Sequence, residues 1–164
     1  MKTSRSLLFI WLIAATCAHT GLGAVSTPSI LQQTAASATG CTLHIHVDGL
    51  RNSNGVVGAA IFKSSDGWPE NMSKSVRHWP TPIEAGSREV TAVMENLPPG
   101  DYGVVVIHDE NGNQKMDRNF IGIPKEGFGF ANNPHVGLSS APFAAAIVHV
   151  TCPVTETKIH LIYK

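Results

Sequence analysis

The feature that most constrains the fold is a series of short segments in which apolar and polar residues alternate. In the segment 41–47, Leu43, Ile45 and Val47 fall on one face, and Thr42, His44 and His46 fall on the other. This period of two is typical of a strand with one buried face. Further strands are expected at 56–62, 76–83, 88–95, 102–108, 144–150 and 158–163. About seven short strands with frequent turns and no long helix predict an all-β fold, an antiparallel β-sandwich or small barrel.

Turn residues add two local expectations. Asn54-Gly55 lies between the first two strands and predicts a β-hairpin there. Pro80 and Pro82 lack a backbone N–H donor, so they restrict the segment 76–83 to the edge of a sheet.

The N-terminus reads as a secretory signal. Lys2 and Arg5 precede an apolar run over 7–18, and small residues near Ala18 or Ala24 suit cleavage. The run is shorter than the roughly 20 residues that span a bilayer, so we expect no transmembrane segment in the mature chain. The expected organisation is a signal peptide at 1–24, a flexible leader at 25–40 and one β-sandwich domain at 41–164. The protein is therefore expected to be secreted or periplasmic.

Charge argues against nucleic-acid binding. The chain carries 12 basic and 12 acidic residues. Removing Lys2 and Arg5 with the signal peptide leaves a net charge of about −2. No basic patch remains to neutralise phosphates.

Two cysteines remain after Cys17 leaves with the signal peptide. Cys41 and Cys152 stand near the two ends of the domain. An oxidising compartment favours a disulfide between them over two separate buried thiols. Such a bridge would close a loop of more than 100 residues, which stabilises a fold by up to about 4–5 kcal/mol.

A polar loop follows the strand 102–108 and carries oxygen-bearing side chains at regular spacing. The candidate Ca²⁺ ligands are the side chains of Asp109, Asn111, Asn113 and Asp117 and the backbone carbonyl of Lys115. Ca²⁺ prefers six to eight such oxygen ligands. The alternative is an Asn/Gly-rich turn whose side chains bond their own backbone.

The loop departs from the helix–loop–helix calcium motif at two positions. Gln114 stands where that motif has Gly, and Phe120 stands where it has a bidentate Glu. No amphipathic helix flanks the loop. We therefore expect a Ca²⁺ loop on the end of a β-strand.

Four stretches of the chain resemble a bacterial secreted family known only as domain of unknown function 2141. They are DGLRNSNGVVGAAIF at 48–62, DGWP at 66–69, the long motif at 96–133 that begins NLPPGDYGVVVIHDENGNQ, and Pro142-Phe143. The resemblance implies a transthyretin-like (prealbumin-like), immunoglobulin-type β-sandwich. Many members have Gly at the position of Gln114, where a non-Gly residue must bear any positive φ at some steric cost. The family has no established activity, so the resemblance implies fold and location rather than function.

Aromatic and histidine side chains supply two further sets of candidates. Phe120, Phe128 and Phe130 lie in a Gly-rich segment. We favour a cap over one end of the sandwich, and the alternative is an exposed platform for a sugar or peptide. Four histidines, His44, His46, His149 and His160, fall on the polar phase of strands. On one shared face they would bind Zn²⁺ or Cu²⁺, whereas the simpler alternative is a set of solvated surface histidines.

No motif of a known hydrolase or metalloprotease is present in the sequence. We therefore expect a secreted, non-enzymatic module with a Ca²⁺-stabilised loop, which binds an unknown envelope protein, peptide or glycan. The alternative is a periplasmic Zn²⁺/Cu²⁺-binding protein that uses the histidine face.

Overall fold

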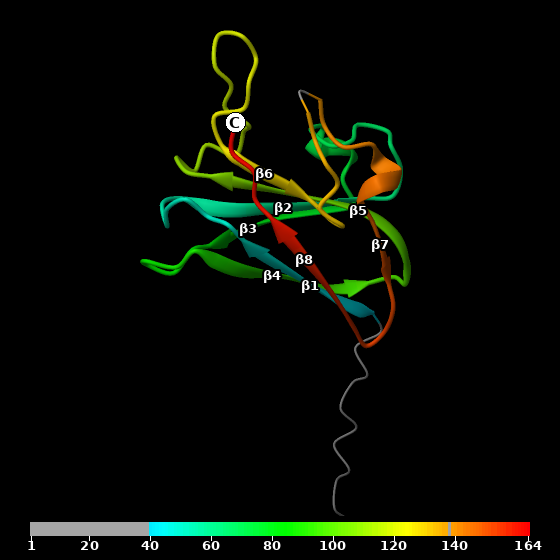
Figure 1. The fold of residues 1–164 in the computed structure, drawn as a ribbon. Coiled ribbons are helices and arrows are strands. Elements are labelled where there is room, and N and C mark those ends of the chain that lie inside the picture. Colours follow the sequence, from blue (N-terminus) through cyan, green and yellow to red (C-terminus); the bar gives the residue numbers. More distant parts are fainter. Residues whose placement is uncertain (1–39, 138) are drawn as a thin grey trace, which may run out of the picture. The chain divides into compact units, whose positions relative to one another are not determined.

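The computed structural model describes residues 40–137 and 139–164 (Figure 1). The expected signal peptide and all but the last residue of the expected leader lie outside these residues. The described part has eight strands: β1 Cys41–Asp48, β2 Val56–Phe62, β3 Arg77–Pro82, β4 Glu89–Leu97, β5 Gly100–Asp109, β6 Gly127–Phe130, β7 Ile147–Val150 and β8 Val154–His160. Two short 3-10 helices, η1 Met72–Lys74 and η2 Phe143–Ala146, join them. The all-β class is confirmed, with one strand more than expected.

The strands form two sheets. One has the order β4-β1-β8, and the other has the order β3-β2-β5-β6, with β7 paired to the first part of β5. Figure 1 shows β1, β4 and β8 in one layer and β2, β3, β5 and β6 in the other. The strand pairs are antiparallel except β1 with β8, which is parallel. The first sheet is therefore mixed, and β3 lies at the edge position that its prolines predict.

Three local expectations need correction. Asn54-Gly55 does not form a hairpin, because β1 pairs with β4 and β8 while β2 pairs with β3 and β5. The chain instead passes from one sheet to the other, and Leu50 is buried in the core. Strand β6 lies inside the segment read as a loop. The last strand begins and ends earlier than expected, because its pairing with β1 runs from Val154 to His160.

Strand β5, in the middle of the five-stranded sheet, is buried on both faces. Val104 and Val106 of β5 join the main core, which includes Ile45 and Val47 of β1. Val105, between them, joins a second apolar cluster with Phe62 and Phe130 on the opposite face. A sheet covered on both faces reads as a continuous apolar run, which explains the sequence of β5.

A disulfide joins Cys41 to Cys152, as predicted. The two Cα atoms are 4.4 Å apart across a separation of 111 residues. The bridge ties the first residue of β1 to the turn between β7 and β8. Across the described residues, no helix has the length and apolar character needed to cross a membrane.

Candidate cation-binding loop and adjoining pocket

The polar loop connects β5 to β6 and begins at a buried carboxylate. Asp109 ends β5 and is only 4% exposed. Its two carboxylate oxygens accept the backbone N–H groups of Asn113, at 3.1 Å, and Gln114, at 2.7 Å. The loop is thus folded around the Asp109 side chain.

Asn111 and Asn113 continue this inward arrangement. The Oδ1 atom of Asn111 accepts the N–H of Asn113 at 3.0 Å, and Oδ1 of Asn113 accepts the N–H of Lys115 at 2.8 Å. Both side-chain amides donate to the Asp117 carboxylate, at 2.7 and 3.1 Å. The four predicted side chains therefore form one cluster. These bonds also fit the alternative of a self-bonded turn, so cation binding stays a prediction.

Gln114 has a left-handed backbone conformation, with φ +62°. A side chain in this region costs roughly 1–2 kcal/mol relative to the usual conformations, and Gly avoids the cost. The N–H of Gln114 is nevertheless held by Asp109. The fold therefore imposes this conformation although the residue does not favour it.

Glu126 is the residue that the sequence reading missed. It is 3% exposed, and its Oε2 atom accepts the N–H of Asp117 at 3.1 Å. Its Oε1 atom is buried and has no hydrogen-bond partner among the described residues. Burial raises the pKa of the Glu126 carboxyl, and the charges of Asp109 and Asp117 raise it further, against the opposing backbone amides of Asp117 and Glu110. Glu126 thus adds a buried carboxylate beside those of Asp109 and Asp117.

The only sequence signal for Glu126 is an acid directly before the strand Gly127–Phe130. It lies well beyond the position at which the calcium motif expects its last ligand. Glu126 reaches the polar loop only because the chain after the hairpin runs back alongside Asp117. The N–H of Lys125, bonded to the carbonyl of Asp117 at 2.8 Å, marks that return.

A pocket of about 450 Å³ lies on the outer face of the five-stranded sheet. Val105 and Phe130 line it from the sheet, and Ile121 and Ile123 line it from the segment after the polar loop. Arg118 also lines the pocket, and its guanidinium pairs with the carboxylate of Glu70. A mainly apolar concavity of this volume with a few polar groups is typical of a binding site.

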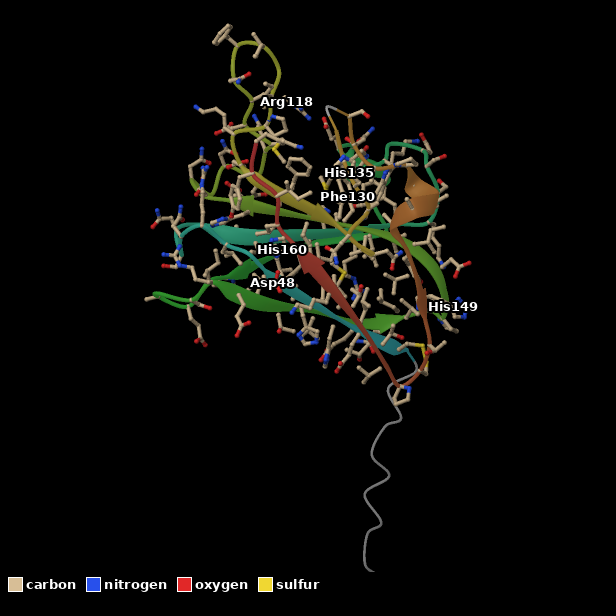
Figure 2. All side chains as sticks on the ribbon, in the orientation of Figure 1. Asp48, Arg118, Phe130, His135, His149 and His160 are labelled. Carbon is tan, nitrogen blue, oxygen red and sulfur yellow. A yellow bond between two sulfur atoms is a disulfide. The ribbon has the colours of Figure 1, made fainter. Side chains whose placement is uncertain are left out.

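The three phenylalanines occupy different environments. Phe128 and Phe130 are buried in strand β6 of the five-stranded sheet, whereas Phe120 is 98% exposed. Phe120 stands at the tip of a short hairpin closed by pairing of Arg118 with Pro124. The Asn119 side chain accepts the N–H groups of Ile121 and Ile123 at 3.1 and 2.9 Å. The hairpin projects from the sandwich above Arg118 (Figure 2).

The structure does not gather the four histidines. His149 lies on β7 of the five-stranded sheet and pairs with Asp101, with 2.6 Å between Nδ1 and Oδ1. His160 pairs with Asp48 at the far end of β8 (Figure 2). His44 and His46 do share one face, together with Glu156, which the sequence reading did not include.

Across the described residues, His44, His46 and Glu156 form the only trio of His, Cys, Asp or Glu ligand atoms that lie within 4.8 Å of one another. The carboxylates of Asp109, Asp117 and Glu126 do not converge this closely. A cation in the loop would therefore require the loop side chains to draw together.

Residues 45–158 match the model of the family DUF2141, described as uncharacterized protein conserved in bacteria. The match covers most of the sandwich, including the polar loop, Glu126 and the segment of Ile121 and Ile123 that lines the pocket. The chain belongs to this family. No curated protein and no solved structure matches this DUF2141 protein.

Proposed function

We propose that this DUF2141 protein is a secreted, non-enzymatic binding module whose β5–β6 loop is ordered by Ca²⁺. The signal-like N-terminus favours a location in the periplasm or outside the cell, and the family resemblance favours a transthyretin-like sandwich. The proposal depends above all on Glu126. A buried carboxylate oxygen without a partner, next to two other carboxylates, is costly unless a proton or a cation compensates it.

The residues present suit a hard cation. Three carboxylates (Asp109, Asp117 and Glu126) and two amide oxygens (Asn111 and Asn113) match the oxygen ligands of Ca²⁺, and the Lys115 carbonyl adds a sixth. Glu126 takes the role of the carboxylate that Phe120 cannot supply. Ca²⁺ would replace the amide donors that now approach Asp117 and would neutralise the mutual repulsion of the acids.

The ordered loop leads directly into one wall of the pocket. Ile121 and Ile123 follow Asp117 within one short hairpin, and both line the pocket. Fixing Asp117 and Glu126 on one ion would fix both ends of this hairpin. We infer that the pocket receives an apolar side chain of an envelope peptide or protein, because its lining favours such a group over a glycan.

Calorimetric titration of the purified protein with CaCl₂ tests the cation site. We expect one site per chain, and we expect Glu126→Gln to weaken binding by at least about tenfold, because a neutral amide supplies one weaker oxygen in place of a charged carboxylate. The matched control is Glu110→Gln, which removes a charge from the same loop where the carboxylate is paired with Arg51. Equal Ca²⁺ affinity in the wild type and Glu126→Gln would refute the assignment of Glu126.

A further inference from the structure

A second group of potential metal ligands lies on the outer face of the three-stranded sheet. His44 and His46 are two residues apart on β1, so their side chains point to the same side. Glu156 on β8 is the parallel-strand partner of His44. The central strand thus supplies two imidazoles, and its neighbour supplies one carboxylate.

The carboxylate faces both imidazoles without bonding to either. Oε1 of Glu156 is 3.8 Å from Nδ1 of His44, and Oε2 is 3.8 Å from Nε2 of His46. Both distances are longer than the donor–acceptor distance of a hydrogen bond. They are close to the separation of about 3.3 Å between ligand atoms around a tetrahedral Zn²⁺ with bonds of about 2.0–2.1 Å. A small movement of the two partly exposed imidazoles and the exposed carboxylate would therefore bring all three atoms to one ion.

His46 already has a partner that orients it. Its Nδ1 atom lies 3.0 Å from the hydroxyl of Thr91, which is opposite His46 on β4. When Nδ1 donates to this hydroxyl, Nε2 keeps its lone pair on the side of Glu156. Metal-binding histidines in proteins are commonly held in this way by a hydrogen bond from the second ring nitrogen.

The neighbouring lysine on β8 does not compete for the carboxylate. Lys158 follows Glu156 on the same face of β8, but its ammonium binds Asp48 at 2.9 Å. Asp48 also holds His160. Among the described residues, the only ionic partners of Glu156 are His44 and His46.

We propose that His44, His46 and Glu156 form a surface site for a divalent transition-metal ion, Zn²⁺ or Cu²⁺. Thr91 orients the His46 ring in this site. Two imidazoles and a carboxylate suit these ions, and Cu²⁺ binds a given set of such ligands more tightly than Zn²⁺. Three protein ligands leave at least one position open for water or for a ligand atom from another molecule. The site is independent of the β5–β6 loop and does not depend on Ca²⁺.

Titration of the purified protein with Zn²⁺ and, separately, with Cu²⁺ in 1 mM Ca²⁺ tests this site. We expect one ion per chain, tighter for Cu²⁺. The double variant His44→Gln/His46→Gln should lose at least about 100-fold in affinity, and Glu156→Gln about tenfold. Thr91→Val should weaken binding by about 10-fold, since it removes the group that orients His46 but no ligand.

Two controls separate the site from ordinary surface histidines. His149→Gln and His160→Gln each remove one exposed histidine outside the trio, and both should bind metal like the wild type. Thermal melting without metal should show that all variants fold. Wild-type affinity in the His44→Gln/His46→Gln variant, or an equal loss in His149→Gln, would overturn the proposal.

Discussion

At the scale of single residues, Glu126 has an energetic cost that the cation-free protein must bear. Its pKa is raised above the usual value of a glutamate by burial and by two neighbouring carboxylates. A raised carboxyl pKa means that the folded state binds the proton more tightly than the unfolded state. The resulting penalty is absent below the unfolded pKa of about 4.3 and is complete above the folded pKa.

Glu126→Gln should therefore stabilise the protein in a chelator at pH 7, by about 1 kcal/mol, because the amide keeps an acceptor for the Asp117 N–H and carries no charge. The gain should disappear near pH 4, where the wild-type carboxyl is protonated in both states. Urea unfolding in EDTA at the two pH values measures this difference. A loss of stability at pH 7 would show that the charge of Glu126 is already compensated without a cation.

Gln114 offers a second residue-scale prediction. Because its φ is +62°, Gln114→Gly should stabilise the protein by about 1 kcal/mol through relief of backbone strain. Gln114→Ala keeps the Cβ atom and should give no such gain. Denaturant midpoints of the three proteins test this, and equal stabilities for Gly and Ala would show that the side chain, not the backbone, matters at this position.

His108 and Tyr163 form a polar pair that the sequence did not reveal. His108 is fully buried, and its Nδ1 atom lies 2.7 Å from the Tyr163 hydroxyl, while Nε2 lies 2.9 Å from the Asn54 carbonyl. Tyr163→Phe should cost about 1–3 kcal/mol, because it leaves a buried imidazole nitrogen without a partner. Thermal melting measures this loss. Tyr102→Phe is the matched control, since it removes only the hydroxyl that donates to the Pro98 carbonyl at 2.7 Å and should cost no more than about 1 kcal/mol.

At the scale of elements, the alternation of apolar and polar residues predicted the strands that have one exposed face. Strand β1 has an alternating burial pattern, and the expected range 41–47 is one residue shorter than the observed strand. The short strand β6, GFGF, was missed because all four of its residues are buried, so it lacks the alternation of apolar and polar residues that marks a half-exposed strand. The pairing of the strands could not be predicted from the sequence either, because the partners of β1 are β4 and β8, which lie more than 40 residues further along the chain.

The same limit applies to the sites. Regular spacing revealed Asp109, Asn111, Asn113 and Asp117, because these ligands are local in sequence. Glu126 and Glu156 join their groups only through tertiary structure. Glu156 reaches its group through the register of β8 with β1, and Glu126 reaches the polar loop because the chain returns beside Asp117. Composition and residue spacing do not show either arrangement.

The disulfide joins two elements across almost the whole domain. Cys41→Ala/Cys152→Ala should lower the free energy of unfolding by about 4–5 kcal/mol, because the bridge closes a loop of 111 residues. Urea unfolding of the variant, compared with the wild type with and without reductant, measures the effect. A loss below about 1 kcal/mol would show that the bridge does not constrain the unfolded chain.

At the scale of the whole molecule, two layers of strands support two chemically different groups. The five-stranded sheet carries the oxygen-rich loop and the apolar pocket, and the three-stranded sheet carries the imidazole–carboxylate trio. Hard oxygen ligands select Ca²⁺, whereas imidazoles select Zn²⁺ or Cu²⁺. We therefore expect a Ca²⁺ response and a Zn²⁺/Cu²⁺ response, each abolished by a different set of variants.

The most direct test of the cation-ordered loop is the melting temperature with millimolar CaCl₂ and with a chelator. Ca²⁺ at 100 times its dissociation constant would stabilise the fold by about 2.7 kcal/mol, or about 10 °C for a domain of this size. The upshift should vanish in Asp109→Ala/Asp117→Ala and persist in His44→Gln/His46→Gln. An unchanged melting temperature of the wild type at millimolar Ca²⁺ would refute the cation-ordered loop and would leave it as a turn held by its own hydrogen bonds.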